Sequence, residues 1–215
     1  LALDPEDVAS PAVSPWIRYL WGHLHERQGN TGKALGHYLS VLEDLPRDPW
    51  VHLRTGILQE QQGEQEQALL HYKTASEAYP DSFRILFRRS IVTMNLLQEE
   101  ESIRIHQKMI ELRPEHALSL NNLAWMYLTA KDPTLRQPEK ALELALKSVE
   151  LDATIDHIDT LAEAYFQTGQ TGKAIEILRK GIREASYPKS RERYLEGQYR
   201  RFRKGDPSVS PPPVS

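Results

Sequence analysis

Residues 49–82 decide the fold, and they read Pro-Trp-Val-His-Leu-Arg-Thr-Gly-Ile-Leu-Gln-Glu-Gln-Gln-Gly-Glu-Gln-Glu-Gln-Ala-Leu-Leu-His-Tyr-Lys-Thr-Ala-Ser-Glu-Ala-Tyr-Pro-Asp-Ser. Apolar and small residues recur in this stretch at helical spacing, with Gly63 in the middle and Pro80 near the end. A glycine after a first helix supplies a tight turn, and a proline after a second helix stops it. The stretch therefore predicts two helices joined by a short turn.

The same landmarks recur along the chain with a period near 34 residues. One series of small residues contains Gly22, Gly56, Ser90, Ala124 and Ala162. A second contains Ala34, Ala68, Ser102, Ala141 and Ala174. Two partial series contain Gly29, Gly63 and Gly169, and Pro46, Pro80 and Pro114. Small residues at two places let paired helices approach closely, and a hairpin of this length cannot bury its own apolar face. The pattern predicts stacked hairpins.

The spacing and residue types of this pattern resemble the tetratricopeptide repeat family. The resemblance implies an all-α fold, a right-handed α-solenoid of about five hairpins. The expected units are 15–48, 49–82, 83–116, 117–154 and 155–186. The segments Asn121–Trp125 and Asp159–Tyr165 look like those of many bacterial repeat proteins, which suggests a bacterial origin.

Three segments lie outside the expected repeats. Residues 1–14 are expected to form a flexible lead-in, and residues 205–215 a disordered, proline-rich tail. Residues 187–204 are expected to form a basic helix that caps the last hairpin, since a solenoid needs a cap. Residues 189–204 carry a net charge of +5, so the rest of the chain carries −8. A basic helix can also bind acidic partners, lipid headgroups or RNA, and this alternative stays open.

Two places depart from the repeat pattern. The third unit has Arg89 where an apolar residue is usual, Leu97 in place of glycine and His106 in place of an aromatic residue. This unit is either looser than the others, or Arg89 pairs with a buried acid. The fourth unit has about five extra residues within 131–138, where two prolines forbid a continuous helix. We expect a protruding loop and a second helix starting near Pro138; the loop either touches a partner or is a tolerated insertion.

Composition excludes several classes of protein. The 215 residues include 27 basic and 30 acidic side chains, a net charge of −3 that does not favour nucleic acid or an anionic membrane. Hydrophobic residues make up 40%, which is ordinary for a globular protein, and there is no long apolar run. The absence of cysteine removes disulfides and thiol chemistry but leaves the compartment open. We expect a soluble cytoplasmic or periplasmic chain, attached to a membrane only through sequence outside it or through residues 189–204.

No catalytic, cofactor-binding or metal-binding pattern is recognised. His23 and His25 are two residues apart and lie on different helix faces, so they do not suit one metal ion. His71 and His106 fall in second helices and are interpreted as packing or surface residues. Thr31 and Thr171 follow turn glycines and are expected to be N-caps. The sequence therefore predicts a protein that is not an enzyme and carries no cofactor and no metal.

The family resemblance implies that first helices line a concave groove, with binding positions that can be carried over residue by residue. The expected groove residues are Trp16, Tyr19, His23, Trp50, Leu53, Ile57, Arg84, Phe87, Ile91, Met94, Leu118, Asn121, Trp125, Leu128, Asp159 and Glu163. Aromatic and apolar side chains dominate this set until the acids of the last unit. In the chaperone-adaptor subtype of the family, charged and amide side chains hold a carboxylate. Two of the equivalent positions here carry Tyr19 and His23, Leu53 and Ile57, and Phe87 and Ile91, which cannot make those bonds, so this subtype is rejected. The alternative is that several of them pack between adjacent helices.

The expected function is therefore that of a scaffold that binds an apolar peptide or amphipathic helix in its groove. The acids of the last unit would meet a basic residue of that ligand. The alternatives are the repeat region of a larger enzyme or membrane-tethered assembly factor, and a self-association module whose groove holds a terminus or a second copy.

Overall fold

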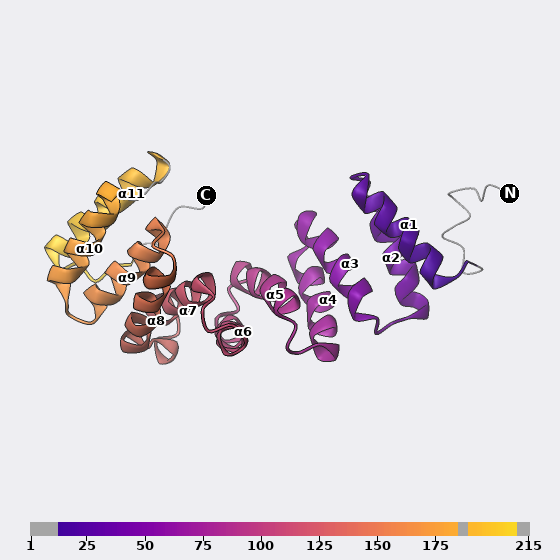
Figure 1. Ribbon diagram of the computed structural model, residues 1–215, viewed down its shortest axis with the longest axis horizontal. Helices are drawn as coiled ribbons and strands as arrows, with labels where there is room; N and C mark the ends of the chain where they lie inside the picture. The colour runs from indigo at the N-terminus through magenta and orange to yellow at the C-terminus, as the bar shows by residue number, and fades with distance from the viewer. Residues whose placement is uncertain (1–12, 185–188, 210–215) are drawn as a thin grey trace. The chain divides into compact units, whose positions relative to one another are not determined.

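The computed structural model describes residues 13–184 and 189–209, and all regular structure within these ranges is helical. The expected all-α fold is confirmed (Figure 1). The helices are α1 Pro15–Arg27, α2 Thr31–Asp44, α3 Pro49–Gln61, α4 Gln65–Ala78, α5 Phe83–Asn95, α6 Glu99–Leu112, α7 Ala117–Thr129, α8 Pro138–Leu151, α9 Ile155–Gln167, α10 Thr171–Glu184 and α11 Lys189–Lys204, with a short 3-10 helix at Pro133–Leu135. None of the described helices is both long and apolar enough to cross a bilayer. Most of the predicted lead-in and the end of the predicted tail lie outside the described residues.

The hairpin of α3 and α4 shows how local sequence produces the repeat. Asp48 caps α3 by accepting hydrogen bonds from the backbone of Trp50 and Val51, both at 3.0 Å. Gly63 then turns the chain with a φ of 82°. A Cβ added to Gly56 would lie 2.7 Å from the ring of Tyr72, so glycine is what lets α3 and α4 approach so closely.

The chain divides into two compact units, Leu1–Ile105 and His106–Ser215, and the division falls within α6. In the first unit, Val51 and Leu58 of α3 share a buried cluster with Ala34, Tyr38 and Val41 of α2. A second cluster of this unit joins α3, α4 and α5. The second unit has its own core, in which α11 contributes Leu195 and Phe202 against α9 and α10. Burial of apolar surface between successive helices therefore stabilises each unit.

A polar bracket recurs between consecutive hairpins of the first unit. The Tyr38 hydroxyl donates to Glu26 at 2.7 Å, and Arg54 of the next hairpin binds the same carboxylate at 3.0 Å. Tyr72 and Glu60 repeat this arrangement 34 residues later with a 2.6 Å hydrogen bond, and Arg88 lies 3.6 Å from Glu60. Each bracket thus ties one first helix to its own partner helix and to the next first helix.

The third hairpin accommodates its departures from the pattern. Arg89 forms an ion pair with Glu101 and donates to the Ser76 hydroxyl at 2.9 Å. The predicted pairing with an acid is confirmed, but the acid is half-buried and not buried. Leu97 occupies the turn with a φ of 55°, the left-handed region that Gly29, Gly63 and Gly169 adopt at the equivalent turns. Leu97 therefore carries a backbone strain that the glycines avoid.

The insertion of the fourth hairpin is held against the end of α7. The Arg136 side chain donates to the Ala130 carbonyl at 2.7 Å, and the Gln137 backbone donates to the Tyr127 carbonyl at 3.0 Å. Helix α8 begins at Pro138, as predicted. The predicted N-caps are wrong by one residue, because Thr31 and Thr171 are the first residues of α2 and α10. The capping position of α2 belongs to Asn30.

Candidate functional site

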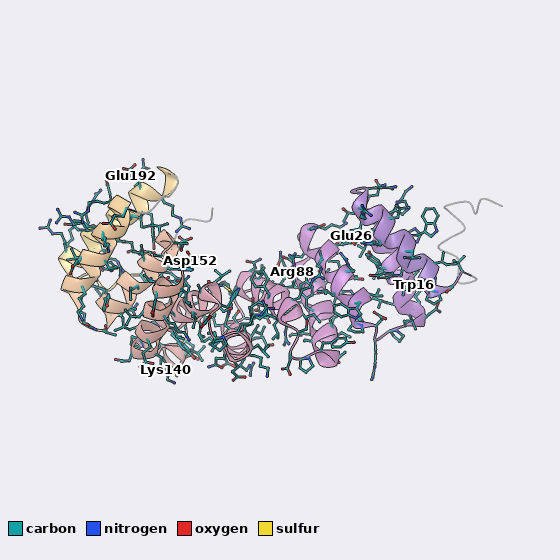
Figure 2. All side chains as sticks on the ribbon, viewed as in Figure 1. Trp16, Glu26, Arg88, Lys140, Asp152 and Glu192 are labelled. Atoms are coloured by element: carbon teal, nitrogen blue, oxygen red, sulfur yellow. The ribbon has the colours of Figure 1, made fainter. Side chains whose placement is uncertain are left out.

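In the first unit, two tryptophans are the most exposed aromatic residues of the predicted groove. Trp16 on α1, labelled in Figure 2, is 65% exposed, and Trp50 on α3 is 47% exposed. Trp16 stacks on Tyr19 with ring centroids 5.5 Å apart, and Trp50 lies 5.4 Å from the ring of Tyr79. These contacts hold the indoles in place while leaving much of their surface open.

The other predicted groove residues of this unit are of two kinds. Tyr19, His23, Phe87, Ile91 and Met94 are half-buried, and Arg84 is exposed. Leu53 and Ile57 are 1% and 6% exposed and belong to the core cluster with Tyr72. The prediction that they face a groove is therefore corrected, because their side chains stabilise the stacking of α3 on α4 and α5.

The second unit keeps fewer accessible residues of the predicted set. Leu118 is 43% exposed and Trp125 is half-buried. Asn121 and Leu128 are 7% and 1% exposed, so both are core residues and not ligand contacts. The same apolar character that suggested a groove here reflects packing between helices.

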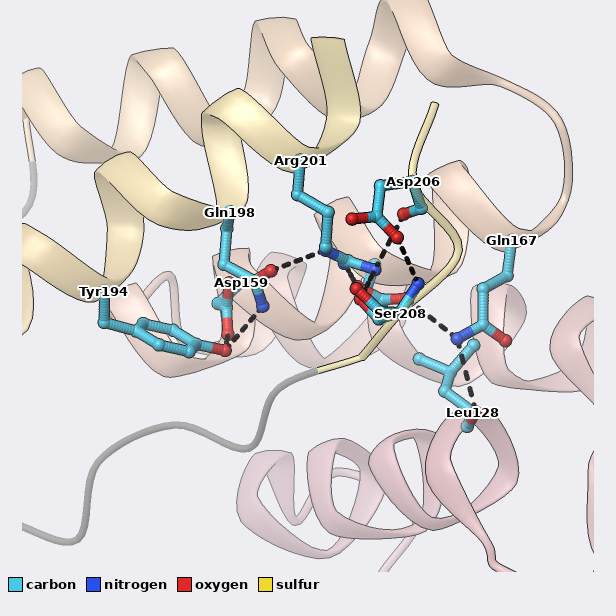
Figure 3. Close-up of polar contacts among 9 residues, drawn as sticks. Leu128, Asp159, Gln167, Tyr194, Gln198, Arg201, Asp206 and Ser208 are labelled. Carbon is cyan, nitrogen blue, oxygen red and sulfur yellow. Dashed lines mark hydrogen bonds and ion pairs between the residues drawn. The ribbon is translucent and has the colours of Figure 1, made fainter. Parts of the chain in front are cut away.

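The acidic end of the predicted groove is covered by the chain itself (Figure 3). Asp159 and Glu163 of α9 are 3% and 0% exposed. Glu163 pairs with Arg201 of α11, and the Asp159 carboxylate accepts from the Tyr194 hydroxyl at 2.8 Å. The expectation that these acids meet a basic residue of a ligand is therefore wrong: α11 supplies the cation.

Further polar groups complete this contact between α9 and α11. Gln198 donates to the Tyr194 hydroxyl at 2.7 Å and accepts from the Arg201 guanidinium at 2.8 Å. Gln167 donates to Glu163 at 2.8 Å. Arg201 also lies over the rings of Phe166 and Phe202, at 5.1 Å and 4.7 Å from their centroids. Helix α11 therefore covers the last hairpin with a specific polar network as well as with apolar side chains.

Burial sets the protonation of the groups in this network. It raises the pKa of Asp159 to about 7, since desolvation disfavours the carboxylate more than the Tyr194 hydrogen bond favours it. The pKa of Tyr194 is also raised, first by burial and then by the neighbouring Asp159. A carboxyl group poised near neutrality often indicates chemistry, but here the covering helix α11 accounts for it.

Sequence reasoning missed two histidine pairs in the first unit. His52 and His71 approach through their Nδ1 atoms at 2.7 Å, and His52 Nε2 lies 3.0 Å from the Pro46 carbonyl. His25 and His37 stack with centroids 5.4 Å apart. Burial lowers the pKa of His71 to about 4, and it lowers that of His37, with their histidine neighbours adding to both shifts. The 34-residue spacing of His37 and His71 was the available signal.

The described residues contain no group of three or more histidine or acidic side chains arranged to hold a metal ion. What the first unit offers is a set of rigid, partly exposed aromatic rings on first helices. Such rings are suited to binding an apolar segment of another polypeptide.

Comparison with protein families identifies the repeat. Models described as tetratricopeptide repeat match residues 19–83 and 159–186. The chain carries tetratricopeptide repeats. The predicted resemblance is thus confirmed, and the predicted bacterial origin stays a prediction. No curated protein matches the chain significantly.

Several solved structures share the fold of these tetratricopeptide repeats. A tetratricopeptide repeat protein from Parabacteroides merdae has a TM-score of 0.71 and 16% identity, over 89% of this chain and 73% of that one. MamA from residue 41 to its end, from Desulfovibrio magneticus RS-1, has a TM-score of 0.66 and 19% identity, over 79% and 93%. YrrB, described as having an unusual peptide-binding site, has a TM-score of 0.71 and 16% identity, over 82% and 89%. At these identities the likeness concerns the fold alone.

Proposed function

We propose that the protein is a non-catalytic scaffold whose first unit binds an apolar peptide or amphipathic helix on the side of the first helices α1, α3 and α5. The observation that carries the proposal is the exposure of Trp16 and Trp50, at 65% and 47%. Tryptophans are among the residues that most often dominate binding energy at interfaces. Both are pre-organised by ring contacts, so little side-chain entropy is lost on binding.

The charges of this face support an apolar ligand. Glu26 and Glu60 lie on the first helices α1 and α3, but each is bound by a tyrosine and an arginine of the repeat brackets. A ligand therefore meets carboxylates that are already neutralised. The proposed ligand is an extended apolar segment or the apolar face of a helix, anchored on the two indoles. YrrB, which shares the fold and is described as having an unusual peptide-binding site, supports a peptide as the ligand.

The test selects peptides from a displayed random library on the immobilised protein and measures their affinity by calorimetry. We expect selected peptides to carry aromatic or aliphatic anchors. The double variant Trp50→Ala and Phe87→Ala should weaken them at least about tenfold, which corresponds to about 1.4 kcal/mol. Leu70→Ala is the matched control, because Leu70 is 66% exposed on the second helix α4. Equal affinities of the double variant and the unaltered protein, with helical content preserved, would contradict the proposal.

A further inference from the structure

Helix α1 carries an uncovered apolar stripe, defined by Ile17, Leu20 and Leu24. Their exposed fractions are 38%, 47% and 42%. Spacings of three and four residues place the three side chains on one face of the helix. Single exposed apolar residues need no explanation, but a contiguous stripe indicates an interaction surface.

The repeat register shows what covers the equivalent face one hairpin later. Ile17 and Leu24 lie 34 residues before Val51 and Leu58 of α3. Val51 and Leu58 are 3% and 1% exposed, because they share a buried cluster with side chains of α2. The covering side chains are Ala34, Tyr38 and Val41.

The third hairpin repeats the arrangement. Ile85 and Val92 of α5 are the next equivalents of Ile17 and Leu24, and both are fully buried. Their cluster includes Ala68, Tyr72 and Ala75 of α4. On both first helices, α3 and α5, this face is therefore covered by the preceding second helix. That helix carries alanine at relative position 0, tyrosine at position 4 and a small or β-branched residue at position 7.

The middle of the stripe shows how the α1 face differs. Leu20 stands where α3 has Arg54 and α5 has Arg88. Those arginines bind Glu26 and Glu60 of the preceding first helix. Because leucine replaces arginine here, the stripe on α1 has no cation that would pair with an acidic residue. All three of its side chains are apolar.

The last described helix shows the contrast. The exposed positions of α11 include Glu192, Arg193, Glu196, Arg200 and Arg203, so its outward face is charged. A terminal helix of a repeat array needs a polar outer face, because that face stays in contact with water. Helix α1 has the character of an internal helix instead.

We propose that the stripe of Ile17, Leu20 and Leu24 binds an amphipathic helix of another polypeptide, seated as α2 sits on α3. The recognised face carries alanine, tyrosine and a small or β-branched residue at positions 0, 4 and 7. Helices α2 and α4 carry this pattern but already use it against α3 and α5, so a second copy of the chain does not supply it. The stripe adjoins Trp16, because Leu20 lies four residues after it on the same helix, but it does not include Trp16 or Trp50.

The probe is a synthetic peptide of residues 65–78, the sequence of α4, stapled through positions 66 and 70. Both positions are exposed in α4, so the staple leaves the alanine and tyrosine face intact. The staple is needed because an isolated 14-residue helix is marginal in water. Binding to the full chain is measured by fluorescence anisotropy, and the oligomeric state by light scattering.

We expect saturable binding of this peptide, weakened at least tenfold by Leu20→Glu. Leu39→Glu should leave the affinity unchanged, because Leu39 is 41% exposed on α2 and lies outside the stripe. A peptide with Tyr72→Glu should bind at least tenfold more weakly. Leu20→Ser serves as a second variant if circular dichroism shows that Leu20→Glu perturbs the fold.

Three results would overturn the proposal. The first is no saturable binding, or binding that neither Leu20 variant weakens. The second is a dimer of the unaltered chain that Leu20→Glu dissociates, which makes a second copy the occupant. The third is binding that occurs only after removal of residues 1–12, which makes that segment the occupant.

Discussion

Leu97 occupies a backbone conformation that the equivalent turns give to glycine. Its φ of 55° costs a residue with a Cβ roughly 1–2 kcal/mol, and its side chain, 64% exposed, gains little from burial. We therefore expect Leu97→Gly to raise the free energy of unfolding by about 1 kcal/mol, although the added chain entropy of glycine offsets part of the gain. Chemical denaturation measures this, and slower hydrogen exchange within residues 95–105 locates it.

The reciprocal substitution is the control for Leu97. Gly63 has a φ of 82° and an open surrounding, so Gly63→Leu should destabilise through the backbone alone. A Leu97→Gly variant that is no more stable than the unaltered protein would show that the turn of the third hairpin has relaxed around leucine.

Some residue roles followed from the sequence and others did not. The pairing of Arg89 with an acid was one of two open alternatives, because a cation in a packed position needs a counter-charge. The burial of Leu53 and Leu128 was not predicted, since positions on a first helix face both a groove and the next first helix. The histidine contacts were missed because they depend on ring placement across a hairpin, which spacing alone does not give.

Helix α11 is held to α9 by the buried ion pair of Arg201 and Glu163, so removing this pair should weaken the packing of α11 on α9. Arg201→Ala leaves Glu163 buried without its cation, which typically costs about 3–5 kcal/mol. We expect a loss of that order in the stability of the second unit, measured by chemical denaturation followed by circular dichroism.

Arg200 is a matched control for Arg201 on the same helix. It pairs with Glu196 at 2.9 Å, but the two side chains are 68% and 55% exposed. Exposed pairs contribute roughly 0–1 kcal/mol, so Arg200→Ala should change little. The double variant Glu163→Leu and Arg201→Met should recover much of the lost stability. Equal effects of Arg200→Ala and Arg201→Ala would show that α11 is held by its apolar side chains alone.

At the scale of elements, periodicity predicted most of the helices and their turns. Pro138 marked the start of α8, because proline suits a first helical turn. The N-caps at Thr31 and Thr171 were placed one residue late, since residue preference does not fix a helix end. The basic helix was predicted as a cap for the last hairpin, but its contact with Glu163 joins residues 38 positions apart. That contact depends on how α11 packs, which no local pattern contains.

At the scale of the whole molecule, the two units should respond differently to acid. Burial lowers the pKa of His71 to about 4, so in this group stability is present above the unfolded pKa near 6.5 and is lost as pH falls toward 4. His106 in the second unit behaves alike, with a pKa lowered to about 4 by burial and then by His116. Asp159 acts in the opposite sense, because its raised pKa of about 7 means that protonation in acid favours the folded state.

We therefore expect lowering the pH from 7 to 5 to destabilise the first unit more than the second, by on the order of 1–2 kcal/mol. Hydrogen exchange detected by mass spectrometry, corrected for intrinsic rates, measures this as a larger loss of protection in α3 and α4 than in α9. Asp159→Asn is the control, because it removes the compensating group from the second unit. Equal losses in the two units of the unaltered protein would contradict the prediction.

The overall architecture was the part of the molecule best predicted from sequence. Each repeat places the same kinds of residues at its helix contacts, so the pattern is seen several times in one chain. Gly22 and Gly56, beneath Tyr38 and Tyr72, are an example of a solution used twice. The candidate site was harder to predict, because it depends on which first-helix positions remain uncovered.

The exposed indoles of Trp16 and Trp50 make the protein its own optical reporter. Their emission in the folded state should already resemble that of tryptophan in water, so the spectral shift on denaturation comes mainly from the half-buried Trp21 and Trp125. A ligand that covers either ring should instead move the emission to shorter wavelength. The fluorescence of these two indoles is thus a poor measure of folding and a direct, label-free measure of ligand binding.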